Sequence, residues 1–402
     1  METIVAVAPD LNTTLAQGEL WLKGAATRSY QRVIRAGEAS TDHMLVLGPQ
    51  GSGQGHLLGR LARNAYENGE TVVMVCLQQR QGALYHFTQY LDGACREVDA
   101  DQQAGFNPFL QPKFQAADGL HALHQLLLQL LGQESGRGIE QFQVELFSML
   151  EYYYQQAPWS GVTGPCFTSF FEFVTAPTTR TWAAATWAMD DAALFMAWFA
   201  SVGRIFCYGE ALGNLMNAAP REVAELLHPI NRLLYLELCI ELADGELAQK
   251  RQQYFMWLLL HAIDSHVANG HRPATVLIDE LPGCCLQESG EKFLAEYLRP
   301  RNRHWRKVIM AWHLSPAALF SPEYPAAINL YESFGYQLLL PAVASEPEPS
   351  MLWRSLSQPE KEVLASLSGA DGELFVRGGG GFGKYLVKMD KQELSLYQPA
   401  RR

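Results

Sequence analysis

The chain has 402 residues, of which 48% are hydrophobic and 18% charged, and its formal net charge is −11. This length suggests two domains, or one large domain with an insertion, and the composition can support a large core. The negative charge excludes a general electrostatic attraction to nucleic acid or anionic lipid, so strong direct nucleic-acid binding is not expected.

Cysteine use and apolar runs indicate a cytoplasmic protein. The seven cysteines are odd in number and form no C-x-x-C pair, which argues against a disulfide framework and against a structural zinc site. The N-terminus has no basic region followed by an apolar run, so it does not look like a signal peptide. The longest apolar stretch, residues 192–203, is too short to cross a bilayer.

The first elements predict a βαβ unit. Residues 1–43 give mixed signals and are taken as an N-terminal lead-in. Residues 44–47 are a short apolar run that ends at a glycine-rich loop, and residues 56–68 have helical periodicity. Residues 71–77 (TVVMVCL) suit a strand that is buried on both faces. This order of strand, glycine loop, helix and strand is expected to begin the core, over residues 44–110.

The middle of the chain differs from its flanks. Residues 111–230 are rich in Leu, Ala, Gln, Phe and Trp and contain long stretches with helical spacing. We expect an inserted all-helical subdomain here. Its tryptophans are expected to be core residues rather than part of a cofactor site. They are Trp159, Trp182, Trp187 and Trp198.

Alternation of strands and helices then returns over residues 231–345, the expected second part of the core. Strands are expected at 232–240, 274–278, 308–312 and 336–340, and helices at 246–269, 290–304 and 324–333. A linker at 342–350 leads into a C-terminal part, residues 346–402, with a helix at 356–367 and two strand-like runs around residues 378–383. The pattern predicts an α/β fold with a mostly parallel sheet.

The most specific motif is LVLGPQGSGQGHLL at residues 45–58. Such a loop turns backbone N–H groups toward a polyphosphate at the N-terminus of a helix. Relative to the pattern G-x-x-x-x-G-K-[ST], Gln54 replaces the lysine and Gly55 replaces the hydroxyl residue. Glutamine offers a neutral donor in place of a full charge, and glycine lacks the hydroxyl that would hold Mg²⁺.

We therefore expect weak or absent nucleotide binding and slow hydrolysis, and a glycine-rich turn that binds nothing is the alternative. The expected nucleotide-binding residues are Gly48, Gly51, Ser52, Gly53, Gln54, Gly55 and His56.

A second motif, ATVLIDELPG at residues 274–283, has the pattern of a Walker B strand. Asp279 at the end of the strand would orient the Mg²⁺ shell, and Glu280 would polarise the attacking water. A merely solvated acidic pair is the alternative, but the position after a phosphate-loop-like unit favours Walker B.

Three weaker features complete the motifs. The basic run at residues 298–307 contains Arg303, and in ring ATPases such arginines reach the phosphates of the neighbouring subunit; a solvated surface loop is the alternative. Residues 378–383 (GGGGFG) favour a mobile hairpin loop, because no helix follows them. Cys284 and Cys285 are expected to be buried structural thiols rather than a redox pair.

Over residues 44–390 the chain resembles the C-terminal ATPase domain of the large type IV secretion and conjugation ATPases, the TraC-like group. The resemblance includes the N-P-F tripeptide at residues 107–109, the helical insertion, the Walker B acids and Arg303 at the family position. The family strand that ends in T-Q-S-P reads H-L-S-P at residues 313–316. The chain departs from the family at Gln54, at Gly55, at Leu314 in place of a sensing glutamine, and at residues 76–78, where the family usually has an aspartate.

This resemblance implies a RecA/AAA-type P-loop NTPase core with the inserted all-helical subdomain. It implies ATP and Mg²⁺ as cofactors, Asp279, Glu280 and Arg303 as catalytic residues, and Asp279 as the residue at the metal. It also implies a homo- or hetero-oligomeric ring with other secretion or conjugation subunits or an active paralogous ATPase, in the cytoplasm or peripheral at the inner membrane. Because the departures cluster at catalytic positions, we expect a degenerate, structural or regulatory subunit, a pseudo-ATPase.

Two alternatives remain open. An active ATP-driven motor or DNA translocase of the HerA or FtsK type would explain the retained Asp279 and Glu280. A nucleotide-sensing AAA-type regulatory protein would bind nucleotide without cleaving it.

Overall fold

The structure is a computed structural model that divides into two compact units. The sheet unit comprises Met1–Asp99, Pro229–Ile240 and Val267–Arg402, and the helical unit comprises Ala100–His228 and Glu241–His266. The structure describes residues 19–24, 30–35, 43–48, 52–77, 82–99, 106–110, 117–135, 139–156, 164–217, 232–239, 245–269, 273–280, 288–298, 306–313, 327–341, 351–367, 373–378 and 381–386.

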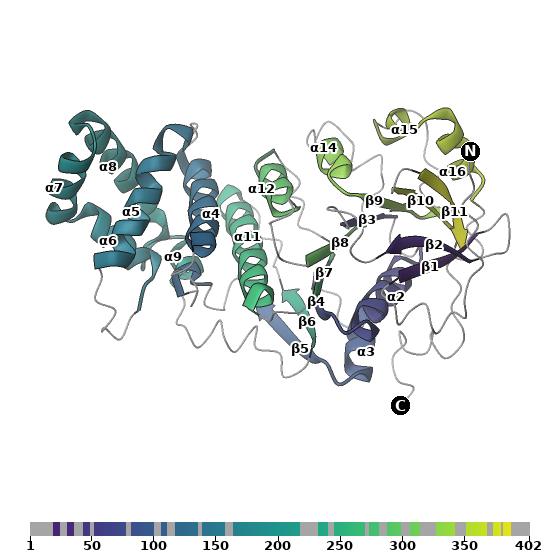
Figure 1. The fold of residues 1–402 in the computed structure, drawn as a ribbon. Coiled ribbons are helices and arrows are strands. Elements are labelled where there is room, and N and C mark those ends of the chain that lie inside the picture. The colour runs from purple at the N-terminus through teal and green to yellow at the C-terminus, as the bar shows by residue number, and fades with distance from the viewer. Residues whose placement is uncertain are drawn as a thin grey trace. The chain divides into compact units, whose positions relative to one another are not determined.

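An eleven-stranded sheet organises the sheet unit, in the order β2-β1-β11-β10-β9-β3-β8-β7-β4-β6-β5 (Figure 1). The seven strands from β9 to β5 run parallel to one another. The central strands β3 and β7 are buried along their whole length, as in sheets covered on both faces. The parallel strands are β3 (Met44–Leu47), β4 (Thr71–Leu77), β5 (Ala94–Asp99), β6 (Leu233–Cys239), β7 (Ala274–Asp279), β8 (Arg306–Trp312) and β9 (Tyr336–Leu339).

The α/β fold class is therefore confirmed, and each parallel strand that the sequence predicts is present, with ends that differ by at most two residues. Strand β5 was not predicted, and neither was helix α3 (Ala83–Tyr90), which precedes it.

Four antiparallel strands extend the sheet beyond β9. They are β1 (Glu19–Gly24), β2 (Tyr30–Arg35), β10 (Glu373–Gly378) and β11 (Gly381–Leu386). Strand β10 pairs with β9 and β11, β11 pairs with β1, and β1 pairs with β2. The predicted lead-in thus supplies two unpredicted strands. Of the hairpin loop predicted at residues 378–383, residue 378 ends β10 and residues 381–383 belong to β11, whereas residues 379–380 lie outside the described residues.

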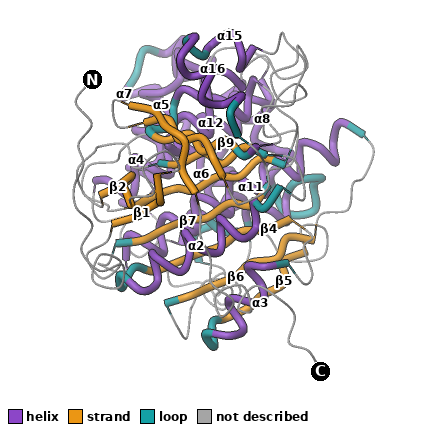
Figure 2. The backbone as a smooth tube through the Cα atoms, turned by 90° about the vertical axis from the view of Figure 1, so that its right-hand side faces the viewer, coloured by secondary structure: helices purple, strands orange, loops and turns teal. Residues whose placement is uncertain are grey.

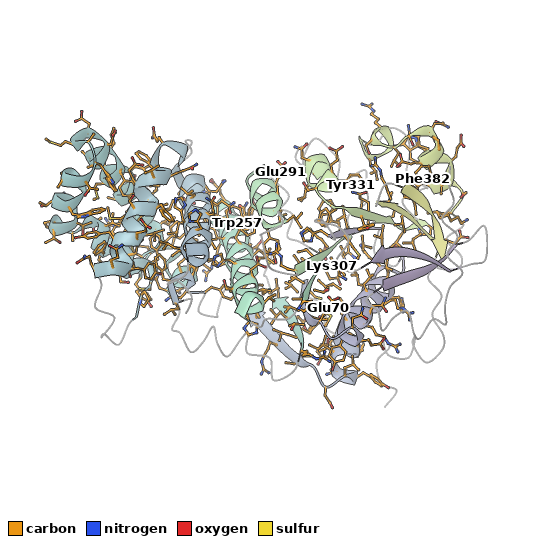
Figure 3. The ribbon with its side chains drawn as sticks, in the orientation of Figure 1. Glu70, Trp257, Glu291, Lys307, Tyr331 and Phe382 are labelled. Carbon is orange, nitrogen blue, oxygen red and sulfur yellow. The ribbon has the colours of Figure 1, made fainter. Side chains whose placement is uncertain are left out.

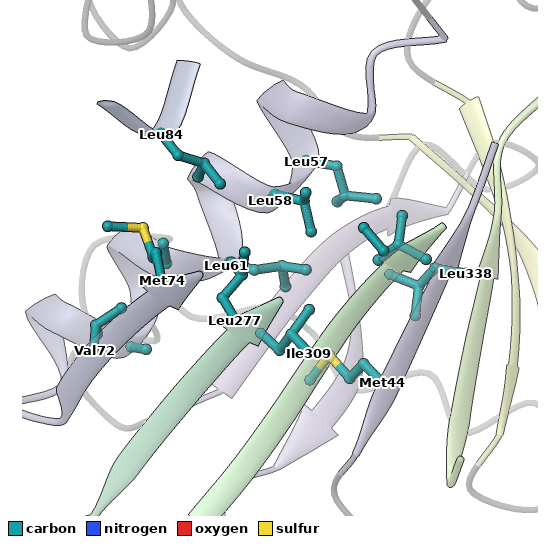
Figure 4. Close-up of a cluster of buried hydrophobic side chains, with 14 of the residues drawn as sticks. Met44, Leu57, Leu58, Leu61, Val72, Met74, Leu84, Leu277, Ile309 and Leu338 are labelled. Atoms are coloured by element: carbon teal, nitrogen blue, oxygen red, sulfur yellow. The ribbon is translucent and has the colours of Figure 1, made fainter. Parts of the chain in front are cut away.

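Helix α2 (Gln54–Glu67) packs on one face of the parallel strands, beside β4 and β7 (Figure 2). Its Leu57, Leu58 and Leu61 enter a buried cluster with side chains of the strands, including Leu277 and Ile309 (Figure 4). Burying one such side chain is worth about 1.5–3 kcal/mol, so this cluster fixes the start of α2 above the sheet.

Three of the remaining helices of the sheet unit match predicted helices, whereas α15 was not predicted. The helix expected from residue 290 begins at Glu288, and its expected end at 299–304 lies outside the described residues, as does the linker at 342–350. Ser357 begins the last helix with a capping box, in which the Ser357 N–H donates to Glu360 Oε2 at 2.7 Å. The helices are α12 (Glu288–Leu298), α14 (Ala327–Glu332), α15 (Met351–Ser355) and α16 (Gln358–Ala365).

Aromatic rings and many leucines together form the core of the helical unit. Phe109, Tyr153, Phe167 and Phe170 are buried and meet edge-on or tilted, and Trp257 of α11 is also buried (Figure 3). The elements are η1 (Pro108–Leu110), α4 (Ala117–Ser135), η2 (Ile139–Phe142), α5 (Gln143–Gln156), α6 (Phe167–Thr175), α7 (Pro177–Thr186), α8 (Met189–Gly203), η3 (Arg204–Phe206), α9 (Gly213–Met216) and most of α11 (Glu246–Asn269).

Unlike Trp257, the three described tryptophans of the predicted insertion lie at the rim of the core rather than inside it. Trp182 is half-buried and stacks on Tyr152 with ring centroids 4.0 Å apart, and Trp198 stacks on Phe142. Their indole N–H groups favour such a position, because a fully buried N–H must find a partner. The prediction of core tryptophans is corrected for Trp182, Trp187 and Trp198, whereas Trp159 lies outside the described residues.

The N-P-F tripeptide has a structural role in this unit. The Asn107 side chain donates to the carbonyl of Pro165 at 2.9 Å and accepts from the Phe109 N–H at 3.0 Å. These bonds hold η1 so that Phe109 enters the aromatic core.

Within the described part of the chain, no helix has both the length and the apolar composition required to span a membrane.

Candidate functional site

The predicted motifs meet at the carboxyl ends of three neighbouring parallel strands. Strand β8 lies between β3 and β7, so the loop after β3, the acids at the end of β7 and the residue after β8 share one edge of the sheet. This edge is where open α/β sheets bind ligands.

The glycine-rich loop lies between β3 and α2, as expected, and residues 48, 52 and 53 of it are described. The Gly48 N–H donates to the carbonyl of Trp312 at 3.5 Å, and a Cβ on Gly48 would lie 2.6 Å from Ser52 Oγ, so this position requires glycine. Gly53, at φ 92°, is the N-cap of α2. Residues 49–51, including the predicted Gly51, lie outside the described part, and His56 is half-buried in the first turn of the helix.

Gln54 is tied to the sheet at the position of the missing lysine. The residue is 2% exposed, and its Nε2 donates to the carbonyls of Val46 at 3.2 Å and Trp312 at 3.1 Å. The amide therefore bridges the ends of β3 and β8. Both protons of Nε2 are used, and the other atom of the amide, Oε1, is buried without a hydrogen-bond partner. Gln54 thus brings neither a charge nor a spare donor to a phosphate.

No steric reason requires glycine at residue 55. A Cβ there would lie 3.6 Å from the Cβ of Ala83, an ordinary van der Waals distance. An alanine side chain would therefore fit at this position. The Ser52 hydroxyl is buried and has no hydrogen-bond partner.

The carboxylate of Asp279 is engaged by a histidine. Asp279 ends β7 and is 1% exposed, and His313 Nε2 lies 2.6 Å from its Oδ1. Burial lowers the pKa of His313, but the hydrogen bond and the negative charges of Asp279 and Glu280 outweigh burial and raise it above its usual value. The sequence places His313 in the H-L-S-P segment, but its pairing with Asp279 was not predicted.

Glu280 has an unusual backbone conformation for a residue with a side chain. Its φ is 73°, and its N–H donates to the carbonyl of Ala311 at 3.1 Å. This bond fixes the bend of the chain as it leaves β7 beside β8.

A buried acid two strands away from Asp279 also escaped the sequence prediction. Glu237 of β6 lies opposite Cys76 of β4, and Cys76 lies opposite Asp279. Burial raises the pKa of the Cys76 thiol well above its usual value, and the charges of Asp279 and Glu237 raise it further. The available signal was a glutamate inside the apolar run LLYLELC at the carboxyl end of a strand.

The basic run does not join this group in the described residues. Arg303 and Leu314 lie outside them. Arg306 and Lys307 begin β8, at the opposite end of the strand from His313, and the Arg306 guanidinium lies over the Tyr297 ring at 4.1 Å (Lys307 is labelled in Figure 3). These two cations therefore lie at the amino ends of the parallel strands, opposite the candidate site.

The residues present do not fit the Mg²⁺ ion that the resemblance implies. The hydroxyl ligand is absent at Gly55, and Asp279 Oδ1 already binds His313. Among the described residues, no group of three or more His, Cys, Asp or Glu side chains could hold a metal ion.

Comparisons with known proteins agree with this fold. The chain resembles the structure of VirB4 of Thermoanaerobacter pseudethanolicus with a TM-score of 0.58 and 14% identity, over 93% of this chain and 98% of that one. The bacterial conjugative coupling protein TrwBdeltaN70 gives 0.49 and 13%, over 88% and 86%, and TrwB in complex with ADP and Mg²⁺ gives 0.49 and 14%, over 89% and 88%. A search of curated proteins gives no significant match.

The family assignment rests on more than half of the sequence. The family model described as the TraG P-loop domain matches residues 27–238, which contain the glycine-rich loop, the N-P-F tripeptide and Glu237. The chain therefore belongs to the TraG P-loop domain family, and its fold is similar to that of VirB4.

Proposed function

We propose that this chain is a degenerate ATPase-like subunit of a type IV secretion or conjugation apparatus, with structural or regulatory work and little or no ATP hydrolysis. The main support for the proposal is the environment of Gln54. This residue replaces the phosphate-loop lysine, and its Nε2 donates both protons to backbone carbonyls of the sheet. A weak nucleotide-binding role for residues 48–56 belongs to this proposal, whereas the catalytic roles of Asp279, Glu280 and Arg303 belong to the active alternative described below.

The energetic argument concerns the transition state. Negative charge spreads over the transferred phosphoryl group, and in active phosphate-loop NTPases a lysine and Mg²⁺ stabilise this charge. Removing one preorganised electrostatic donor typically lowers kcat by about 10²–10³. This site lacks the lysine charge and the hydroxyl of the metal site, so the two losses together leave turnover near background.

The subunit would act through its contacts. We place it in a homo- or hetero-oligomeric ring with other subunits of its apparatus or with an active paralogous ATPase, in the cytoplasm or peripheral at the inner membrane. Light scattering on the purified chain, alone and mixed with the ATPases of its own system, checks this. A chain that stays monomeric in every mixture contradicts it.

Phosphate release with ATP and Mg²⁺ tests the catalytic part of the proposal. The native chain and the Glu280→Gln variant are compared at the same concentration. We expect equal rates, both far below the roughly 1 s⁻¹ at the lower end of typical enzymes. Native turnover above that rate, abolished by Glu280→Gln, would overturn the proposal.

That opposite result would support the second candidate, an ATP-driven motor or translocase. The observation in its favour is that Asp279 and Glu280 remain at the end of a buried strand beside the phosphate loop. A nucleotide-sensing role requires binding without turnover, which calorimetry with ATP and ADP would detect.

A further inference from the structure

Helix α8 (Met189–Gly203) contains the longest apolar stretch of the chain, residues 192–203, yet only one face of this helix is buried. The inner face, with Phe195 and Phe199 fully buried, packs against α4, α6 and α7 (Figure 1). A surface helix normally has charged or polar residues on its outer face, and a helix that is apolar all round is normally covered on every side. The outer face of α8 therefore does not have the composition of a solvated surface.

This outer face is apolar in its middle and charged only at its ends. Leu194 is 60% exposed, Trp198 one turn further is half-buried, and no charged residue lies between Asp191 and Arg204. A single exposed leucine is ordinary, but an uncharged face about three turns long is typical of an interaction surface. The exposed residues of the outer face are Asp190, Ala193, Leu194, Ala197, Ser201 and Arg204.

The outer face has the same spacing when it is read from either end. Asp190 and Arg204 lie seven residues on either side of Ala197, and Ala193 and Ser201 lie four residues on either side of it. Steps of three and four residues place all five on one side of the helix. If two such helices lie antiparallel, the acidic end of each meets the basic end of the other, so the face is complementary in charge to a second copy of itself.

Arg204 is accessible for such a contact. Its side chain is 76% exposed, and its Nε donates to Glu210 Oε1 at 3.1 Å. The guanidinium has further N–H donors besides Nε, so it can bind a second carboxylate. Because exposed ion pairs contribute little to stability, sharing Arg204 between Glu210 and a second copy costs little.

We propose that two copies of this chain pair through the outer faces of their α8 helices, antiparallel about a two-fold axis at Ala197. The net charge of −11 makes two copies repel elsewhere, which favours a face with an uncharged centre and complementary ends. The small side chains of Ala193, Ala197 and Ser201 allow the two helices to approach closely. This inference goes beyond the proposed function, because a two-fold contact closes on itself and does not build a ring.

Disulfide cross-linking of the full chain tests the pairing and its direction. The two copies of residue 197 lie side by side at the axis, so Ala197→Cys should give a cross-linked dimer on mild oxidation. The two copies of residue 193 lie about 12 Å apart along the helices, so Ala193→Cys alone should give none. A mixture of Ala193→Cys and Ser201→Cys should cross-link again.

The native chain, oxidised in parallel, gives the background from its own cysteines. No dimer of Ala197→Cys above this background would overturn the inference. Equal cross-linking of Ala193→Cys and Ala197→Cys would also overturn it, because helices that pair antiparallel about Ala197 keep the two copies of residue 193 apart.

Light scattering tests the contribution of the apolar centre. We expect Leu194→Glu to weaken the pairing by about tenfold or more, because a charge would be buried without a partner. The native particle should then have about twice the mass of the variant at the same concentration. The matched control, Leu247→Glu on α11, introduces the same charge at a residue that is 50% exposed and should pair like the native chain.

Both leucines are exposed, so both variants should keep the native fold, which circular dichroism checks. Equal masses of the native chain and Leu194→Glu would overturn the inference, and so would equal weakening by both substitutions.

The failure of this inference differs from failure of the proposed function. Rapid ATP turnover that needs Glu280 would overturn the proposed function, whatever the cross-linking of α8. Absence of the Ala197→Cys dimer in a chain with slow turnover would overturn only the pairing.

Discussion

Gly53 and Gly55 lie on either side of Gln54 but differ in what they require of the backbone. Gly53 has a φ of 92° and open space where a Cβ would lie, whereas Gly55 lies inside α2, where a Cβ would be 3.6 Å from that of Ala83. Only the first position therefore depends on the conformational freedom of glycine. Replacing Gly53 by alanine tests the cost of backbone strain, and replacing Gly55 by alanine tests whether a Cβ is tolerated inside the helix.

We expect Gly53→Ala to lower the free energy of unfolding by about 1–2 kcal/mol, the cost of a left-handed residue with a Cβ. Gly55→Ala should be neutral or raise it by up to about 1 kcal/mol, because alanine restricts the unfolded chain. Urea denaturation of the two variants measures both. A Gly53→Ala variant as stable as the native chain would show that the loop does not need the bend seen here.

At the scale of elements, helix α4 contains a buried titratable group. His124 is 6% exposed, and its Nε2 lies 2.8 Å from the carbonyl of Gln143 at the start of α5. Burial lowers the pKa of His124, while the hydrogen bond to Gln143 acts in the opposite direction with a smaller effect. The folded pKa therefore lies below the unfolded value of about 6.5.

This shift predicts that acid destabilises the helical unit. Above about pH 6.5 His124 is neutral in both states and has no effect. As the pH falls from there toward the folded pKa, the unfolded state binds the proton first and stability decreases. We expect the melting temperature to fall less between about pH 8 and pH 5 in His124→Gln than in the native chain.

The matched control for this experiment lies one turn away on the same helix. His121 is exposed, and its charge is a smaller cause of the lowered pKa of His124, so His121→Gln should weaken the native dependence on pH far less than His124→Gln does. Equal slopes for the native chain and His124→Gln would show that burial of this ring does not couple proton binding to folding.

The elements that the sequence revealed are those with an unbroken apolar or helical pattern. Buried strands such as TVVMVCL and ATVLID were predicted because both of their faces are covered. Strand β5 (ACREVD) was missed because it lies at the edge of the sheet, where Arg96 and Glu97 are exposed and the apolar pattern is lost. Strands β1 and β2 are also short and charged, and they pair beyond the parallel core.

The sequence predicted those parts of the candidate site whose residues are close together along the chain. The loop with Gln54 and the acids Asp279 and Glu280 each follow a single strand, so local spacing predicts them. His313 reaches Asp279, and Glu237 comes into register with it two strands away, through the pairing of strands that are far apart in sequence. Spacing along the chain does not give that register, so the partner of Asp279 required the structure.

At the scale of the whole molecule, the two units have separate cores of different composition. The buried cluster around α2 is made of aliphatic residues and a few aromatic ones from the sheet unit, such as Leu57, Met74 and Leu277. The helical unit is centred on aromatic rings, among them Phe109, Phe167 and Phe170. Each core is completed by residues of its own unit, which is the condition for independent cooperative unfolding.

We therefore expect differential scanning calorimetry of the full chain to show two transitions. Gly53→Ala should lower only the transition of the sheet unit, because Gly53 lies in Met1–Asp99. Acid should lower mainly that of the helical unit through His124, and His124→Gln should reduce this shift without moving the other transition. A single transition whose calorimetric and van't Hoff enthalpies agree would contradict this expectation, because the chain would then unfold as one cooperative body.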